Sequence, residues 1–252
     1  MAKRKGDIML ALLGAILLTG AAVAAAAQGG VDDRLYAELL QRHVHRGQVD
    51  YAGLKRQEEK LDRYLAVLEK VDSRTLGRAQ RFAFYINAYN AWTLKLVLTG
   101  YPGVTSIKQL GSLFRSPWKK KICRLDGKVM SLDDIEHGIL RPRFADPRVH
   151  FAVVCAARSC PPLQSVPYRG AVLDAQLDAA ARAFINDPRA NRFEGGVLYV
   201  SRIFKWYAGD FGNDPAGFVA RYAGGELKRR LERAPRPVRI AYLEYDWRLN
   251  GK

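Results

Sequence analysis

The chain has 252 residues, of which 48% are hydrophobic and 26% charged, and its formal net charge is +16. This composition is typical of a globular protein and excludes a disordered or collagen-like chain. The length is sufficient for a substantial core that depends on neither a metal ion nor several disulfides.

The N-terminus has the features of a secretory signal. Positive residues at 3–5 precede an apolar run, and two alanine-rich triplets then fit a cleavage site. We therefore expect a signal peptide over residues 1–27 and a single domain over residues 28–252, periplasmic or secreted, with no stable membrane span after cleavage. The alternative is an uncleaved anchor, because the apolar run over residues 8–27 approaches membrane-spanning length.

The charge and the motifs of the sequence limit which partners are expected. An exported protein without a recognisable nucleic-acid-binding motif is not expected to bind nucleic acid. Basic clusters at residues 119–121 and 228–230 favour an anionic component of the cell envelope, and the alternative is that they only keep the surface solvated. No cofactor is expected, because the chain lacks a glycine-rich phosphate-binding loop and other cofactor motifs.

The first half of the chain is predicted to be helical. Amphipathic spacing predicts helices over residues 32–44 and 54–71. Residues 73–99 are apolar nearly all round, which predicts a buried central helix. Its two asparagines, Asn87 and Asn90, share a face and need hydrogen-bond partners when buried, so they either clamp a neighbouring loop or orient a catalytic group.

The middle of the chain carries a predicted hairpin and a predicted capped helix. An Asp-Gly pair within residues 121–130 predicts the hairpin. A serine cap predicts a helix from residue 131 to about residue 140, ended by Pro142. This helix carries Glu136 and His137.

The stretch that follows is the centre of the functional hypothesis. Residues 149–154 are apolar and mostly β-branched apart from His150, which predicts a strand buried on both faces. Such a strand would deliver Cys155 into a loop closed by prolines at 161–162, and strand ends are where α/β-type folds place their chemistry. The alternative is that this thiol is an inert core residue.

The last third of the chain predicts a helix over residues 173–185, a hairpin over 191–201, short helices between 203 and 233, and a closing strand over 238–243. The fold class is therefore predicted to be α+β, with a helix-rich N-terminal half packed on a small, mostly antiparallel sheet.

A thiol nucleophile needs a base, and the base needs a group that orients it. On the predicted strand, His150 and Cys155 would point to opposite faces. His137 could fold back towards Cys155, with Asn87 or Glu136 orienting its ring in a papain-like arrangement.

The three cysteines leave their bonding open. An odd number leaves at least one thiol free, and either Cys155 or Cys123 could pair with Cys160. A Cys/His metal site formed by Cys155, Cys160, His137 and His150 is a further alternative, although the spacing of the two cysteines is looser than usual.

Three segments together resemble a family of uncharacterised proteins, the domain of unknown function 547 (DUF547). They are residues 84–91, 131–141 and 148–162, and the resemblance covers about residues 75–190. It implies no settled activity. The α+β fold predicted from the chain is expected to be similar to that of papain or transglutaminase.

The resemblance also bears on the site. It implies that relatives retain the Glu-His pair of Glu136 and His137 and a cysteine at Cys155, but have serine at the position of Cys160 and lack His150. A disulfide is then not the shared purpose of the family, and His150 is not its general base.

The first functional hypothesis is an exported thiol-dependent hydrolase or acyltransferase. Cys155 would attack an acyl carbonyl, His137 would act as the base, and Asn87 or Glu136 would orient the ring. The candidate substrate-binding residues are Asn90, Arg141 and Arg148. The alternatives are a non-catalytic cell-envelope binding module and the structural metal site.

Overall fold

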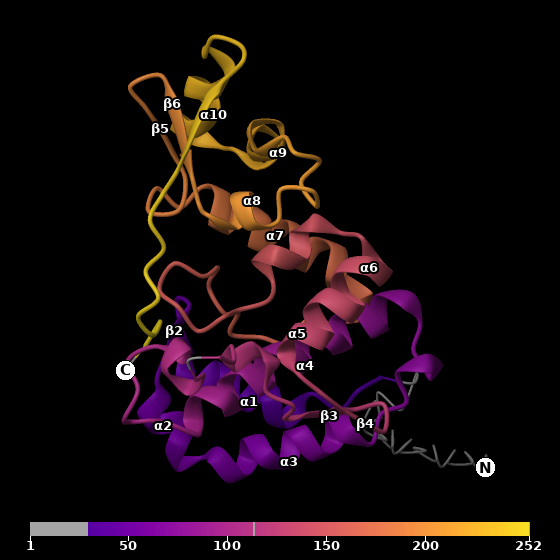
Figure 1. The fold of residues 1–252 in the computed structure, drawn as a ribbon. Coiled ribbons are helices and arrows are strands. Elements are labelled where there is room, and N and C mark those ends of the chain that lie inside the picture. The colour runs from indigo at the N-terminus through magenta and orange to yellow at the C-terminus, as the bar shows by residue number, and fades with distance from the viewer. Residues whose placement is uncertain (1–29, 113, 252) are drawn as a thin grey trace, which may run out of the picture.

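The computed structural model describes residues 30–112 and 114–251. The predicted signal peptide lies outside the described residues. Figure 1 shows a group of helices at one end of the molecule and a small sheet with short helices at the other. In the described part of the chain, no helix combines the length and apolar character that crossing a membrane requires.

The N-terminal helices form the first end of the molecule. They are α1 (Arg34–His43), α2 (Tyr51–Arg56), α3 (Glu58–Glu69) and α4 (Arg78–Leu98), with the two-residue strands β1 (Val44–His45) and β2 (Gln48–Val49) after α1 and the short 3-10 helix η1 (Ser73–Thr75) before α4. The helix predicted over residues 54–71 is therefore two helices, and the first begins earlier because Asp50 caps it by accepting a hydrogen bond from Gly53. The predicted central helix is confirmed, since α4 is buried along nearly its whole length.

Two 3-10 helices, η2 (Ile107–Leu110) and η3 (Pro117–Lys119), lead into the predicted hairpin, β3 (Cys123–Leu125) and β4 (Lys128–Met130). The hairpin is confirmed, and both of its turn residues have positive φ. Ser131 then caps α5 (Leu132–Ile135), which continues through a wide turn, η4 (Glu136–Leu140), into α6 (Arg141–Phe144). The prediction that Pro142 ends this helix is wrong, because Pro142 lies in the first turn of α6, where proline is tolerated.

The strand predicted over residues 149–154 does not exist. This segment begins as a 3-10 helix, η5 (Pro147–Phe151), which Asp146 caps by accepting a hydrogen bond from the Arg148 amide. The chain then runs as a buried loop whose backbone groups bond to a side chain of α4. The apolar run reflects burial between two cores, which gives the same sequence pattern as a buried strand.

The C-terminal third forms the other end of the molecule. Its elements are η6 (Gly170–Val172), α7 (Leu173–Ile185), β5 (Arg192–Glu194), β6 (Val197–Val200), α8 (Ile203–Trp206), α9 (Pro215–Tyr222), α10 (Gly225–Glu232) and β7 (Arg239–Tyr242). β5 pairs with β6 antiparallel, and β7 adds to β6 in parallel. The α+β class is confirmed, whereas the papain-like comparison is not.

Two clusters of buried side chains correspond to the two ends of the molecule. The first core is built around α4 from the helices and the hairpin of residues 31–144, with parts of the segments up to residue 177. The second core is rich in phenylalanine and lies between η5, α7, α8, α9 and the three-stranded sheet. Val149 belongs to the first core and Phe151 to the second, so η5 joins them.

The C-terminal tail links the two ends of the molecule. After β7 it runs back from the sheet to the N-terminal helices (Figure 1). There the Asn250 amide donates to the Ala156 carbonyl, and Tyr51 donates a hydrogen bond to the Asn250 side chain. The tail thereby carries Tyr245 and Trp247 across the junction of the two cores.

Candidate functional site

A cavity of about 240 Å³ lies where the two cores meet. We call it the aromatic pocket, because Trp118, Trp206, Trp247, Tyr207 and Tyr245 form much of its wall. The predicted site residues Glu136, His137 and Cys155 also line it, together with His150 and Cys160. The structure therefore gathers three of the four predicted catalytic residues in one cavity.

The asparagines of α4 are backbone clamps. The side chain of Asn90 accepts a hydrogen bond from the Val154 amide and donates one to the Ala152 carbonyl, each at 2.9 Å. Asn87 makes the same pair of bonds with the backbone of Tyr168. Each asparagine side chain thus provides hydrogen-bond partners for two buried backbone groups that are not paired in a β-sheet. Asn90 holds the chain one residue before Cys155, whereas Asn87 holds a segment that does not line the pocket.

Cys155 is bonded to Cys160 by a disulfide. The free thiol required by the first hypothesis is therefore absent in this state, and the two cysteines do not form a metal site with the histidines. The Tyr245 hydroxyl lies 3.2 Å from both sulfur atoms, at the pocket wall. Cys123, on β3, is a buried free thiol, and burial raises its pKa to about 12.

His137 is hydrogen-bonded to an arginine. Its Nδ1 lies 2.8 Å from Nη1 of Arg141, and its Nε2 lies 3.7 Å from the carboxylate of Asp133. Because arginine can only donate, Nδ1 is the acceptor and a neutral ring carries its proton on Nε2. Neither of these contacts is the pairing with a cysteine sulfur that the sequence suggested.

The other histidine of the pocket has a carboxylate partner. His150 is 3% exposed, and its Nε2 lies 2.7 Å from Asp210. Arg141 donates two hydrogen bonds to Asp210, at 2.6 and 2.9 Å, and this pairing lowers the pKa of Asp210 to about 2 although burial opposes it. Burial lowers the pKa of His150 below its ordinary value, against the opposing effect of Asp210.

This pairing fixes the tautomer of His150. Since the Asp210 carboxylate accepts, Nε2 of His150 donates, and the lone pair of the neutral ring is on Nδ1. The ring stacks on Tyr207 with 3.9 Å between ring centres. Strand alternation does not turn His150 away from Cys155, because η5 is a 3-10 helix and not a strand.

Glu136 supports the pocket through two tyrosines. Its carboxylate is 6% exposed and accepts hydrogen bonds from Tyr89 at 2.9 Å and from Tyr207 at 2.6 Å. Burial, together with the nearby Glu136, raises the pKa of both tyrosines. Glu136 thus positions aromatic rings of the pocket and is not hydrogen-bonded to an imidazole.

The two predicted substrate-binding arginines both hold structural ion pairs. Arg141 bonds Asp210 and His137 at the edge of the pocket. Arg148 bonds Asp146, Asp174 and Asp178, so it fastens η5 to α7 and does not line the pocket.

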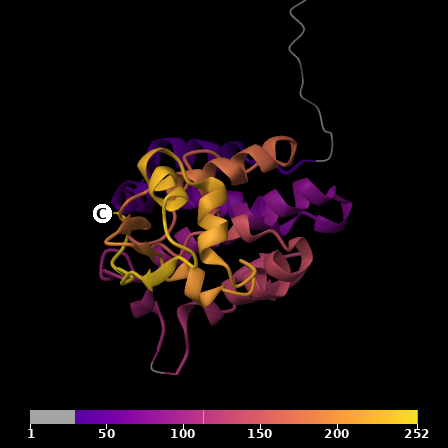
Figure 2. The same cartoon turned by 90° about the horizontal axis from the view of Figure 1, so that it is seen from above.

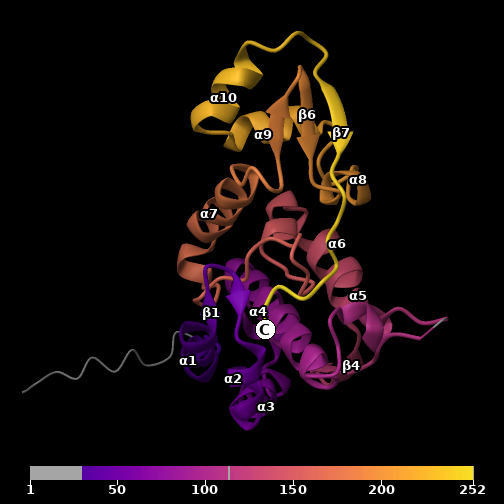
Figure 3. The same cartoon turned by 90° about the vertical axis from the view of Figure 1, so that its left-hand side faces the viewer.

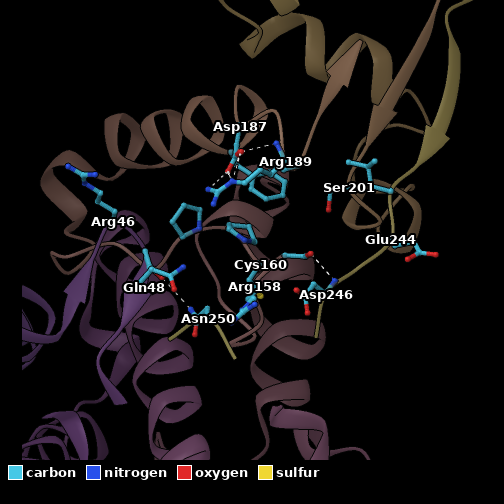
Figure 4. A pocket seen from close by; sticks show the side chains of 17 residues that line it. Arg46, Gln48, Arg158, Cys160, Asp187, Arg189, Ser201, Glu244, Asp246 and Asn250 are labelled. Atoms are coloured by element: carbon cyan, nitrogen blue, oxygen red, sulfur yellow. Dashed lines mark hydrogen bonds and ion pairs between the residues drawn. The ribbon is translucent and has the colours of Figure 1, made fainter. Parts of the chain in front are cut away.

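A second cavity, of about 280 Å³, lies beside the disulfide loop (Figure 4). Cys160 and Pro161 line both cavities, so this short segment forms their shared wall. Figure 4 shows Arg189 turned towards Asp187, and the two are 2.7 Å apart. The remaining charges of this cavity are also of both signs.

Three residues of the site could not be predicted from the sequence: Asp210, Tyr207 and Tyr245. His150 was expected only as an alternative metal ligand and not as the base. Asp210 is 60 residues from the histidine it contacts, and Tyr245 is 90 residues from Cys155. No local motif reports contacts over such separations. The one sequence feature that pointed to this site was His150, a histidine within an apolar run and therefore expected to be buried.

The fold and the site define an α+β protein whose two cores enclose an aromatic pocket, with a disulfide and two histidines in its wall. Residues 73–185 match the family model described as "Protein of unknown function, DUF547", and this match confirms the resemblance over that part of the chain. The match includes both cysteines and both histidines of the pocket, but not Asp210 or Tyr245. No curated protein and no solved structure matches the chain.

Proposed function

We propose that the protein is a thiol-dependent hydrolase or acyltransferase that acts in the aromatic pocket. Its nucleophile, Cys155, is inactive while it is bonded to Cys160 and becomes active when this disulfide is reduced. One observation carries the proposal: the disulfide shares a pocket wall with a neutral histidine that has its own buried carboxylate partner. A cysteine, a histidine and an acid are the parts that thiol catalysis needs.

Activation is a thiol–disulfide exchange with a dithiol reductant. One thiolate of the dithiol attacks a sulfur of the Cys155–Cys160 bond, and its second thiol then displaces the mixed disulfide. The dithiol leaves as a disulfide, and the two cysteines each end as a thiol. The Tyr245 hydroxyl, which contacts both sulfur atoms, can then donate a hydrogen bond to the Cys155 thiolate.

The geometry favours His150 over His137 as the base. In His150 the Nδ1 lone pair is free and Asp210 orients the ring, whereas Nδ1 of His137 already accepts from Arg141. Burial keeps His150 neutral near pH 7, ready to accept the Cys155 proton. Cys155 then attacks an acyl carbon, the leaving group takes the proton from His150, and water or another acceptor cleaves the thioester.

A matched pair of serine variants tests the proposal. Cys160→Ser leaves Cys155 as a free thiol, and Cys155→Ser removes the nucleophile with the same loss of the disulfide. With a p-nitrophenyl ester as substrate, we expect Cys160→Ser to be active without reductant, the wild type only after dithiothreitol, and Cys155→Ser under neither condition. Equal rates for the two variants would exclude Cys155 as the nucleophile, as would iodoacetamide labelling of Cys155 no faster than in denatured protein.

The choice of base has its own test in the Cys160→Ser background. We expect His150→Asn to lower the rate at least about a hundredfold and His137→Asn to have the smaller effect. Because the pKa of His150 is lowered, the acid limb of the pH–rate profile should lie below about pH 6.5. An acid limb above that pH, or a larger loss in His137→Asn, returns the role of base to His137.

Export is part of the proposal. A disulfide between Cys155 and Cys160 is favoured in an oxidising compartment, where disulfides persist. The mature protein should therefore be recovered from the periplasm or medium, beginning near residue 28. Recovery of the intact chain from the cytoplasm would contradict this.

A second candidate function is non-catalytic binding of a cell-envelope component. Trp206, Trp247 and Tyr245 contact one another, with ring centres 4.6 to 5.7 Å apart, and Trp118 contacts Trp247. Aromatic faces of this kind suit sugar rings and other flat ligands. Quenching of tryptophan fluorescence by envelope polysaccharide fragments, unchanged in Cys155→Ser and without turnover in Cys160→Ser, would favour this function.

A further inference from the structure

The loop between η2 and η3 projects from the body of the protein, as Figures 2 and 3 show from two directions. Its base is closed by two backbone hydrogen bonds between Ser112 and Arg115. Phe114 lies within this turn and is 98% exposed, the most exposed of the large hydrophobic side chains in the described residues. In this position the phenylalanine contributes nothing to either core.

The charged residues within this stretch of the chain are of one sign. Residues 100–125 contain six lysines and arginines and no aspartate or glutamate. Arg115 and Lys119 are exposed, and within the described part of the chain neither has an ion-pair partner. The nearest compensating contacts involve other residues: Lys121 pairs with Asp134, and Arg124 lies near Glu69.

We infer that this loop docks on an anionic phospholipid surface. Phe114 would enter the boundary between headgroups and acyl chains, while Arg115 and Lys119 would lie at the phosphates. An apolar side chain flanked by cations is the combination that binds peripheral proteins to anionic bilayers. A single phenylalanine on a narrow tip offers too little area for a stable protein–protein interface, which needs about 800 Å² on each partner.

The loop is continuous with the aromatic pocket. Ser116 and Trp118 line the pocket, and Lys108 of η2 lies 4.0 Å above the ring of Trp247. Docking through Phe114 therefore sets the mouth of the pocket beside the lipid surface, where it can receive an amphiphilic ligand. The inference does not depend on the chemistry proposed for Cys155.

The emission of a tryptophan placed at position 114 is read as the difference from the wild type, which has four tryptophans of its own. The test uses the full chain, whose apolar leader could hold it on any vesicle, so binding alone is not the measurement. Phe114→Trp is mixed with phosphatidylcholine vesicles that contain or lack phosphatidylglycerol, and with brominated lipids that quench inserted indole. We expect a blue shift and quenching only with phosphatidylglycerol, both lost at high salt because the attraction is screened.

The matched control is Val172→Trp, since Val172 is also an exposed large hydrophobic residue, at 50%, but lies on η6. Its emission should not respond to either vesicle. An unquenched Phe114→Trp on anionic vesicles would overturn the inference, and so would an equal response to phosphatidylcholine alone. A blue shift that grows with protein concentration in the absence of vesicles would assign the loop to a second copy of the chain instead.

The cations have a separate test. Replacing Arg115 and Lys119 together by serine should raise the lipid concentration needed for half-maximal quenching of Phe114→Trp roughly thirtyfold, at about 1 kcal/mol for each charge. Lys70→Ser, which removes an exposed lysine from the end of α3, should leave it unchanged. Equal effects of the two changes would show that only net charge matters and would refute docking through this loop.

Discussion

The two cores of this protein are assembled in different ways. The first is built around α4, whose buried residues are neighbours along one helix. The second brings together phenylalanine rings from widely separated segments, at residues 151, 184, 204, 211 and 218. The pocket lies at their junction, where residues of the family-matched segment meet residues from the last third of the chain.

The largest expected effect comes from the residue that ties η5 to the second core. Phe151 is fully buried and contacts four phenylalanine rings. Phe151→Ala should lower the free energy of unfolding by about 4 kcal/mol, because it leaves a cavity in a packed cluster. Urea unfolding followed by circular dichroism and by tryptophan fluorescence measures it.

That experiment also tests whether the cores are separate. Phe84→Ala, the matched change at a buried phenylalanine of the first core, is the control. Coincident transitions in both variants would indicate one cooperative unit. Two transitions, with only one of them shifted, would indicate that the cores unfold independently.

The clamp of α4 should give the next largest effect. Asn90→Ala leaves the Val154 amide and the Ala152 carbonyl buried without partners, which should cost about 3 kcal/mol. Asn87→Ala should cost a similar amount, because it frees the backbone of Tyr168. In the Cys160→Ser background only Asn90→Ala should change the iodoacetamide labelling rate of Cys155, and equal changes would mean that the clamp does not position this residue.

A smaller and opposite effect is expected in the first core. Burial raises the pKa of Asp33 to about 6, although Tyr64 donates a hydrogen bond to it. The folded protein therefore binds this proton more tightly than the unfolded chain, so Asp33 favours folding below about pH 4 and opposes it as the pH rises through 6.

Asp33→Asn keeps an acceptor for Tyr64 and removes the ionisation. It should raise the free energy of unfolding at pH 7 by about 1–2 kcal/mol and have little effect at pH 4. This gain is smaller than the pKa shift alone would give, because the Asp33 side chain is only half-buried and solvent screens its charge. Thermal unfolding at the two pH values measures this. The same gain at both values would mean that the effect is not one of ionisation.

The smallest effect is expected at the junction itself. Tyr207→Phe removes one of the two hydrogen bonds to Glu136 and should cost about 1 kcal/mol. Tyr199→Phe is the control, because Tyr199 lies on the face of β6 opposite the residues that enter the second core. A cost well above that of the control, with a single transition retained, would show that the pocket contributes to holding the cores together.

Local signals predicted much of the fold. The burial of α4, the span of α7 and both hairpins follow from periodicity and turn residues that lie within a few positions of one another. The segment over residues 149–154 was misassigned because an apolar run records burial on both sides without recording the backbone geometry. Its amide and carbonyl groups bond to Asn90, 62 and 64 residues away, and no local rule contains that contact.

The residues of the candidate site also fall into a group that the sequence predicted and a group that it could not predict. Glu136, His137 and Cys155 were predicted to meet, and they line one cavity. The acid that orients a histidine and the hydroxyl that contacts the sulfurs come from the second core and the tail, so they could be found only from the structure.

Cys160 and Pro161 form a wall that the aromatic pocket shares with the second cavity, which carries Arg46, Arg158 and Arg189. A compound that occupies the arginine-bearing cavity with different affinity in the oxidised and reduced states must shift the midpoint potential of the disulfide, by about 30 mV for every 1.4 kcal/mol of that difference. By reciprocity, reduction changes the affinity for that compound by the same free energy. Such a compound would act on the disulfide through Cys160 and Pro161, which face both cavities.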